Sequence, residues 1–262
     1  MGVRALLFMS DNFASAHQKL AWGRKHISEL ERELAAFLKV SPGKIIGEPH
    51  PDKPGYRVYK LRMARPLPPE FSMIAGDAVD NLRASLDHAM FTIAIAAAPL
   101  GRKVEHAYFP FAGSATWFEN QLKRCSDIPF EMWPFLRTLQ PYKGGNPLLV
   151  ALNDASNRNK HALILSVAAI SRTMRQRVQG ISGEIRKMAD VPIWDRTKQE
   201  MELLTTGSDA KFDAEFNFQF IVTLDEVPIS EHALTALYAI ASEVERILLA
   251  LEAESRRLGL IK

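Results

Sequence analysis

Apolar residues recur every three or four positions over long stretches of the chain, which is the spacing of one buried helix face. In the first stretch, positions 11–40, the repeating residues are Leu20, Ile27, Leu30, Leu34 and Phe37. The same spacing predicts helices over 69–98, 147–161 and 230–258. Proline, serine or glycine residues stand at most of their ends, as expected where a helix begins or stops.

Elsewhere the period changes to two, which is typical of strands with one buried face. Positions 44–48 and 56–64 predict a small N-terminal β-hairpin around a turn rich in proline and glycine. The second strand alternates, which predicts that Lys60 and Arg62 share one face opposite Tyr59, Leu61 and Met63. The region 162–224 predicts an antiparallel sheet, most clearly over 212–224, where apolar residues alternate with acidic or amide residues. Weaker strand candidates are 162–170, 173–179, 181–188 and 199–205. The predicted fold class is α+β, with a bundle of long helices packed on a sheet formed by the C-terminal half.

Length and composition agree with this pattern. The chain has 262 residues, of which 47% are hydrophobic and 24% are charged, so it can bury a sizeable core. No stretch has the composition of a linker, and we therefore expect one α+β domain over 1–262. The 33 basic and 30 acidic side chains give a formal charge of +3, too small to indicate a nucleic-acid partner by itself.

Cysteine and apolar runs bear on the compartment. Cys125 is the one cysteine, so no disulfide within the chain can form, as is usual in a reducing compartment. The apolar run at 5–9 is shorter than the core of a signal peptide. The longest apolar stretch, 89–100, is shorter than the roughly 20 residues that cross a membrane. We expect a cytoplasmic protein with no membrane partner.

Two polar clusters interrupt the helical pattern. The first lies in the 69–98 helix and forms two stripes beside the core face, one with Asp77, Asn81, Ala84 and His88, and the other with Asp80, Arg83 and Asp87. Its arginine lies three residues after one carboxylate and four before the next, which is the spacing of ordinary surface ion pairs. Aspartate and asparagine are poor helix formers, however, so this many of them need compensating contacts or a function.

The second cluster ends the 147–161 helix. There Asp154, Asn157 and His161 share one helix face. Arg158 lies four residues after Asp154 and could pair with it, and Lys160 is typical of a last helical turn. A plain helix C-terminus also favours basic residues. If the two helices pack antiparallel or crossed, their clusters form a shared polar seam, which would suit either proton transfer or a purely structural network.

The segment Asp80 to His88, followed by Asp154 to His161, resembles a large group of uncharacterised bacterial proteins. The group shares an Asn-Leu-Arg-x-x-Leu-Asp-His-like helix and a later Asp-x-x-Asn-x-x-Lys-His-like segment. Phe109-Pro110 and Gln140-Pro141-Tyr142 also match it. This resemblance covers about residues 71–165 and implies no particular activity.

Arg83 and His88 also have the Arg-(four residues)-His spacing of HEPN domains. That resemblance implies a helical, usually dimeric, metal-independent ribonuclease, in which the arginine holds the scissile phosphate and the histidine is the acid or base. Asn81 and Asp87 complete the predicted catalytic set. The predicted substrate-binding residues are Asp154, Asn157, Lys160 and His161. RNA and a second copy of the chain are therefore the expected partners.

Other chemistries are less well supported. The chain has no phosphate-binding glycine loop, nucleophile elbow or zinc-protease motif. His88, His161, Asp77, Asp87 and Asp154 are compatible with a mixed metal site but do not require one, and no cofactor is predicted. The basic stretch 171–187 could be an RNA footprint or a solvated sheet face. The expected function is an HEPN-like ribonuclease of defence or toxin type. The alternative is a non-catalytic binding or scaffold protein whose clusters form a structural network.

Overall fold

The computed structural model describes eleven parts of the chain, and the statements below refer to them. They are residues 13–40, 43–160, 162, 165–170, 179–182, 185–188, 194–195, 197–208, 210–213, 219–224 and 232–261. His161, Ser230 and most of the basic stretch 171–187 lie outside the described residues.

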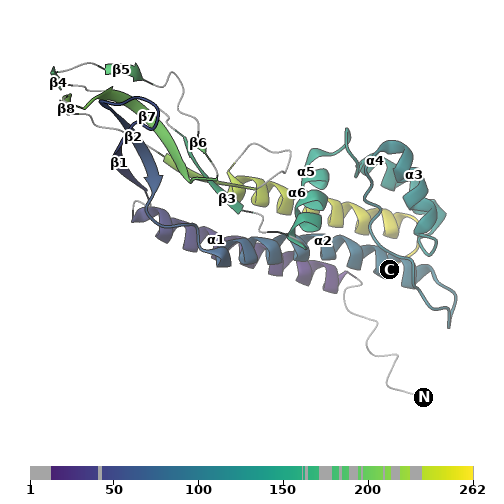
Figure 1. The fold of residues 1–262 in the computed structure, drawn as a ribbon. Helices are drawn as coiled ribbons and strands as arrows, with labels where there is room; N and C mark the ends of the chain where they lie inside the picture. Colours follow the sequence, from purple (N-terminus) through teal and green to yellow (C-terminus); the bar gives the residue numbers. More distant parts are fainter. Residues whose placement is uncertain are drawn as a thin grey trace. The chain divides into compact units, whose positions relative to one another are not determined.

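The long helices follow the predicted pattern closely (Figure 1). The α-helices are α1 (Ala14–Lys39), α2 (Pro69–Ala97), α3 (Ala115–Arg124), α4 (Trp133–Leu139), α5 (Pro147–Asn159) and α6 (Ala233–Arg257). A single 3-10 turn, η1 (Phe130–Met132), leads into α4. The four helices predicted from apolar spacing are confirmed to within a few residues at each end.

The strands build an antiparallel sheet and two smaller pairs. They are β1 (Gly43–Pro49), β2 (Tyr56–Met63), β3 (Leu165–Ile170), β4 (Gln179–Ser182), β5 (Ile185–Met188), β6 (Trp194–Asp195), β7 (Glu200–Gly207), β8 (Lys211–Asp213) and β9 (Gln219–Leu224). The main sheet has the order β1-β2-β7-β5, and β6 pairs with β7 as well. The remaining strands form the pairs β3-β9 and β4-β8. The α+β class is therefore confirmed.

The N-terminal hairpin is present and extends the sheet formed by later strands. Tyr56 to Arg62 of β2 pairs antiparallel with Glu200 to Gly207 of β7, so strands about 140 residues apart in sequence lie side by side. Of the predicted strand 212–224, the described ends belong to β8 and β9, which pair with different strands, and 214–218 lie outside the described residues. Of the candidate 173–179, the structure describes Gln179 alone.

The residues group into two compact units. The first contains Met1–Glu31, Ser72–Ile164 and Leu224–Lys262, and the second contains Arg32–Phe71 and Leu165–Thr223. Because each unit gathers segments from distant parts of the sequence, neither is a continuous stretch that could be cut out. The prediction of a single domain over 1–262 stays a prediction.

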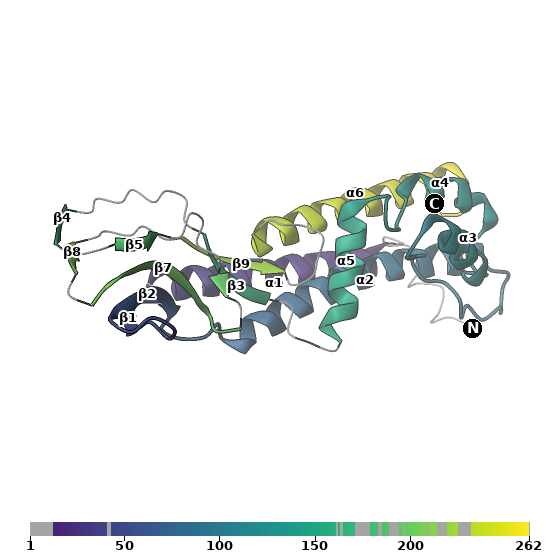
Figure 2. The same ribbon diagram turned by 45° about the horizontal axis from the view of Figure 1, so that its top comes forward.

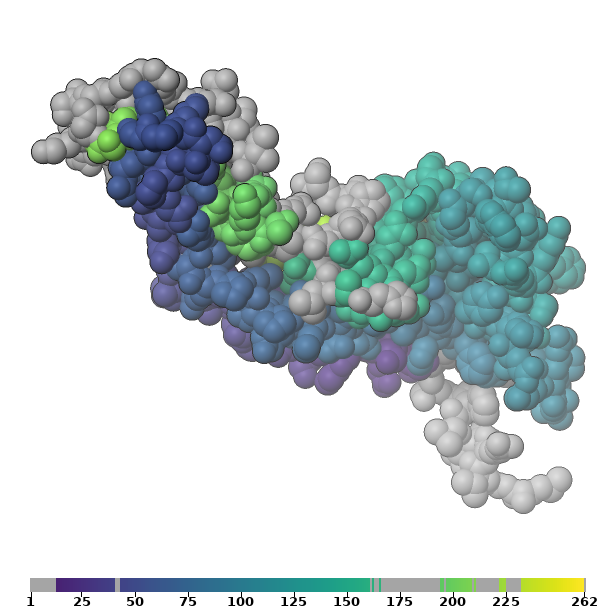
Figure 3. All heavy atoms as spheres, viewed as in Figure 1, coloured from purple at the N-terminus to yellow at the C-terminus, as the bar shows by residue number. Residues whose placement is uncertain are grey.

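The first unit contains the residues of both polar clusters that the structure describes. Its core comes from the apolar faces of α2, α5, α6 and the first part of α1, where Leu82, Leu86, Leu152, Val244 and Leu248 are fully or almost fully buried. Figure 2 shows α5 running across the direction of α2 and α6. In the space-filling view the residues of α3 to α5, in teal, form one continuous surface (Figure 3).

The second unit contains the main sheet. Leu61, Met201 and Leu203 form a buried apolar cluster against which Trp194 packs. None of the described helices combines the length and the apolar character that crossing a bilayer would require.

Candidate functional site

The two polar clusters meet where α5 crosses α2. Both oxygens of the Asp80 carboxylate accept hydrogen bonds from α5, one from Ser156 Oγ at 2.7 Å and the other from Asn159 Nδ2 at 2.9 Å. One turn further along α2, Arg83 Nη1 donates to Asn153 Oδ1 at 2.6 Å. Residue numbers rise on one helix as they fall on the other, although the helices cross and touch over a short stretch. We call these five side chains the α2–α5 seam.

A glycine permits this close approach. A Cβ atom on Gly76 would collide with the side-chain amide of Asn159. The last turn of α5 therefore rests against a helix surface that lacks a side chain at this position. The seam thus joins crossed helices, one of the two arrangements that the sequence left open, and it uses the stripe with Asp80 and Arg83 and not the stripe with Asn81 and His88.

Arg83 is held from two sides. Besides its bond to Asn153, its guanidinium carbon lies 4.8 Å from the centre of the Phe111 ring, a cation–π distance. The surface ion pairs with Asp80 and Asp87 expected from the spacing are not what the described residues show. Asp80 is bound to α5 instead, and Asp87 has a different hydrogen-bond partner.

Asp87 holds the loop that follows α2. Its Oδ1 accepts a hydrogen bond from the backbone N–H of Phe109 at 2.8 Å. Burial raises the pKa of the Asp87 carboxyl, although the Phe109 N–H and the nearby charges of Arg83, His88 and Lys160 oppose this rise. A buried carboxyl bound to a backbone amide fixes the course of the chain, so the structure gives Asp87 a positioning role.

The segment just after Phe109-Pro110 lies next to Gln140-Pro141-Tyr142. Ala112 forms a bridge with Tyr142, and its N–H donates to the Pro141 carbonyl at 3.0 Å. Gln140 has a positive φ of 49°, and its carbonyl accepts from Tyr142 and Asn146 N–H groups, each at 2.8 Å. This compact turn delivers the chain to the start of α5.

Asn146 then fixes that start. Its side-chain oxygen accepts from the Leu148 and Leu149 N–H groups at 3.1 and 3.3 Å, as an N-cap does. Its amide nitrogen donates to Glu243 of α6 at 2.7 Å. Gln140 and Asn146 therefore position the start of α5, and Asn146 ties it to α6.

A separate cleft of about 460 Å³ lies between α1 and α2. Its lining consists of Ser15, Gln18, Lys19 and Trp22 from α1 and Asn81 and His88 from α2. The two helices approach closely at Gly23, where a Cβ would lie 3.0 Å from the Leu82 side chain and 3.1 Å from the Ala78 carbonyl oxygen. Both helix segments belong to the first unit.

Hydrogen bonds hold one wall of this cleft. Lys19 Nζ donates to Asn81 Oδ1 at 3.2 Å, and Asn81 Nδ2 donates to the Asp77 carbonyl at 2.8 Å. Trp22 is 50% exposed. Lys25 Nζ lies 4.1 Å from the centre of its ring, and the His26 ring meets it edge to face with the centroids 5.6 Å apart.

The predicted catalytic residues are thus divided between two places. Asn81 and His88 line the cleft, whereas Arg83 and Asp87 contact α5 and the loop after α2. Five positions on a helix turn the side chains of Arg83 and His88 about 140° apart, and the structure shows the result.

The predicted substrate-binding residues of the second cluster that the structure describes do not line the cleft between α1 and α2. Asn157 and Lys160 are exposed and share a long hydrogen bond of 3.4 Å, and Asp154 is half-buried. His161 lies outside the described residues, so its distance from His88 is not tested. Nowhere in the described ranges do three histidine, cysteine or acidic side chains group so that they could hold a metal ion.

Sequence reasoning missed the contribution of α1. Ser15, Gln18, Lys19 and Trp22 have the spacing of a helix face, i, i+3, i+4 and i+7, and this pattern could have been noticed. It lies beside the apolar stripe that identified the helix, where polar residues ordinarily face solvent. A tryptophan within a polar stripe was the available signal.

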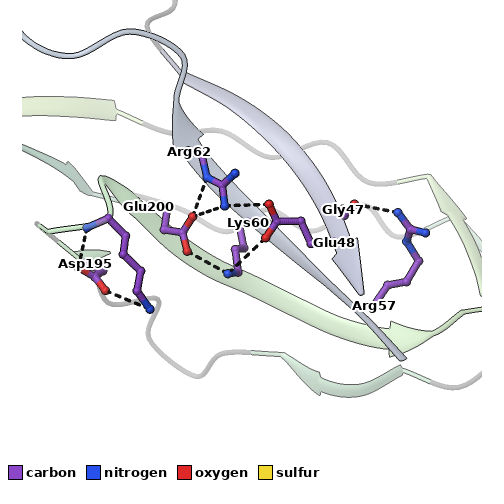
Figure 4. Close-up of polar contacts among 8 residues, drawn as sticks. Gly47, Glu48, Arg57, Lys60, Arg62, Asp195 and Glu200 are labelled. Atoms are coloured by element: carbon purple, nitrogen blue, oxygen red, sulfur yellow. Dashed lines mark hydrogen bonds and ion pairs between the residues drawn. The ribbon is translucent and has the colours of Figure 1, made fainter. Parts of the chain in front are cut away.

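The sheet of the second unit carries a compact ion cluster on one face (Figure 4). Glu200 of β7, 7% exposed at its side chain, pairs with Lys60 at 2.9 Å and with Arg62 at 2.6 Å. Arg62 also pairs with Glu48 of β1 at 2.8 Å. This confirms that Lys60 and Arg62 share the face predicted from alternation in β2, and it links three neighbouring strands.

Charge pairing outweighs burial at Glu200. Burial alone would raise the pKa of its carboxyl, but hydrogen bonds from Lys60 and Arg62 and the charges of both hold that pKa below its ordinary value. The same bond to Glu200 is the main cause that raises the pKa of Lys60. All four side chains are engaged with one another, so we regard the cluster as structural.

Comparison of the chain with protein-family models, with curated protein sequences and with solved structures found no match.

Proposed function

We propose that this is a non-catalytic binding protein that holds a phosphate-bearing ligand in the cleft between α1 and α2. The α2–α5 seam is, in this proposal, a structural network. One observation carries the proposal: all six side chains that line the cleft can donate a hydrogen bond, and none of them is a carboxylate.

Lys19 supplies the positive charge in this set. Its bond to Asn81 uses one of three ammonium protons and places the amine at the cleft wall. Since Asn81 is itself fixed by the Asp77 carbonyl, the amine is positioned before a ligand arrives. Charged donors bind phosphate oxygens with shorter and stronger hydrogen bonds than neutral donors do, so an anion rich in oxygen fits this lining best.

The ribonuclease hypothesis stays a prediction. It requires an arginine and a histidine at one phosphate, but Arg83 is engaged by Asn153 and Phe111 while His88 lines the cleft. A nuclease site within one chain would need Arg83 to leave both partners. The homodimer and the cytoplasmic location expected from the sequence likewise stay predictions.

Titration of pyrophosphate into the full chain tests the proposal by calorimetry. We expect saturable binding that weakens about tenfold or more in Lys19→Gln, because a charged hydrogen bond is lost. Lys53→Gln, which changes an exposed lysine in the turn between β1 and β2, is the matched control and should bind like the unchanged protein.

Two results would contradict the proposal. One is the absence of pyrophosphate binding, or binding that Lys19→Gln leaves unchanged. The other is cleavage of a single-stranded RNA by the purified chain in the presence of a chelator, if that cleavage is lost in both Arg83→Gln and His88→Gln. The second result would restore the ribonuclease hypothesis.

A further inference from the structure

We infer that the ligand of the α1–α2 cleft is a nucleotide, whose phosphate lies at Lys19 and His88 and whose base stacks on Trp22. The inference rests on the proposed function, because it requires that this cleft binds phosphate. The structure adds the aromatic wall, which a phosphate alone does not use.

Trp22 presents half of its surface to solvent while lining a cleft whose other members are polar. An indole is a large apolar group, and leaving it exposed forgoes the favourable burial that a large side chain usually contributes. Bases stack on such rings with little dependence on base identity, because every base has a π-face. An exposed indole beside hydrogen-bond donors is therefore suited to a ligand that is flat at one end and anionic at the other.

The neighbours of Trp22 restrict its ring. His26 meets the ring edge to face, with an interplanar angle of 88°, and Lys25 lies over the ring at 4.1 Å. Both contacts come from α1 itself, since Lys25 and His26 follow Trp22 by three and four residues. Because Lys25 covers one face of the ring, a base would stack on the opposite face, and a ring held in this way loses less side-chain freedom when it does so.

The spacing of the two binding elements matches one nucleotide. Lys19 and Trp22 are three residues apart on α1, which corresponds to a rise of about 4.5 Å along the helix axis. His88 and Asn81 stand across the cleft on α2. A ligand whose base and phosphate are joined through one sugar can therefore reach both elements at once.

The cleft is large enough for one nucleotide. Its volume of about 460 Å³ lies at the lower end of the range for small-molecule sites. The same chemistry is offered by a free nucleotide and by one unpaired residue of an RNA strand.

Calorimetry with four probes separates these possibilities: pyrophosphate, ribose 5-phosphate, adenosine 5′-monophosphate and a single-stranded oligoadenylate. We expect adenosine monophosphate to bind about tenfold or more tightly than ribose 5-phosphate, since stacking adds to phosphate binding. Trp22→Leu should remove that difference by weakening the binding of adenosine monophosphate far more than that of ribose 5-phosphate. Lys19→Gln should weaken the binding of both.

Trp117→Leu is the matched control, because Trp117 is a similarly exposed tryptophan on α3, at 57%. It should retain the preference for adenosine monophosphate. If the oligoadenylate binds more tightly than the monophosphate, an RNA strand is the source of the nucleotide. The opposite order identifies a free nucleotide, and either order supports the inference.

Equal binding of adenosine monophosphate and ribose 5-phosphate would overturn the nucleotide inference while the proposed phosphate site stands. A preference for the base that survives in Trp22→Leu would also overturn it. Failure of pyrophosphate to bind would remove the proposed function as well, so the two failures are distinguishable.

Discussion

Arg83 and His88 show how a motif can be present in the sequence without forming a site within one chain. Arg83 binds Asn153 and packs on Phe111, and His88 lines the α1–α2 cleft. The residue spacing therefore predicted the helix correctly, but it did not predict which residues each of the two side chains contacts. A difference of five positions places two residues on different helix faces, so within one chain they can contact the same ligand only if that ligand wraps around the helix.

Asp87 provides a test of its positioning role. Asp87→Ala leaves the Phe109 N–H without its partner, and we expect the free energy of unfolding to fall by about 1–3 kcal/mol. Asp87→Asn keeps an acceptor oxygen, so it should retain most of the stability. Urea unfolding at pH 7 measures both variants.

The pH dependence has a definite sign for this residue. Burial raises the pKa of Asp87 in the folded state. The stabilisation that this raised pKa gives the folded state is therefore greatest below the unfolded pKa of about 3.9, and it is lost as pH rises through the folded pKa. The stability of Asp87→Asn relative to the unchanged protein should therefore increase with pH. A relative stability that falls with pH would contradict the assigned environment.

Cys125 should be chemically inert in the folded protein. Burial raises the pKa of its thiol to about 11, against opposing hydrogen bonding with Tyr108. The thiolate is the reactive form, so little of it exists at neutral pH. A disulfide reagent at pH 8 should label the native chain slowly and the urea-unfolded chain rapidly. Equal rates would show that the thiol is accessible and ionised.

Among the elements, the helices themselves were easier to predict than the elements that each helix packs against. The apolar spacing of α1, α2, α5 and α6 identified each helix because one buried face repeats every turn. It could not indicate that α5 would cross α2 at Gly76, since that contact depends on the absence of a side chain at one position. The seam was anticipated from the two polar clusters, but the pattern could not show which of their residues would pair with each other.

The sheet repeats this lesson. Alternation in β2 predicted that Lys60 and Arg62 share a face, and the ion cluster confirms it. The partner strand β7 lies far along the sequence, and pairing between distant strands has no local signal. Glu200 consequently entered no candidate set, although it is the buried centre of the cluster.

Glu200 gives this cluster a pH-dependent contribution. Its pKa is lowered in the folded state, so its stabilisation is present above the ordinary value of 4.5 and is lost as pH falls through the folded pKa. Glu200→Gln should reduce the free energy of unfolding at pH 7 by about 1–3 kcal/mol, because Lys60 and Arg62 lose the more buried of their two carboxylate partners. The deficit should shrink below pH 4 in urea titrations, and a constant deficit would contradict the pairing.

For the molecule as a whole, the two units carry different kinds of polar cluster. In the second unit, the charged side chains of the ion cluster pair with one another across three strands. In the first unit, the side chains of the α2–α5 seam form hydrogen bonds with one another. The cleft between α1 and α2 is lined by side chains that can donate hydrogen bonds. In this cleft the described lining side chains all can donate hydrogen bonds and include no carboxylate, so it is where we expect a phosphate-bearing ligand to bind.

The most direct test compares Arg83→Gln with His88→Gln in one pair of measurements, thermal unfolding and pyrophosphate binding. Arg83→Gln should lower stability by about 1–3 kcal/mol and bind pyrophosphate normally while folded. His88→Gln should unfold like the unchanged protein and bind pyrophosphate several-fold more weakly. If Arg83→Gln instead loses binding without losing stability, Arg83 belongs to the ligand site, and the separation of seam and cleft is wrong.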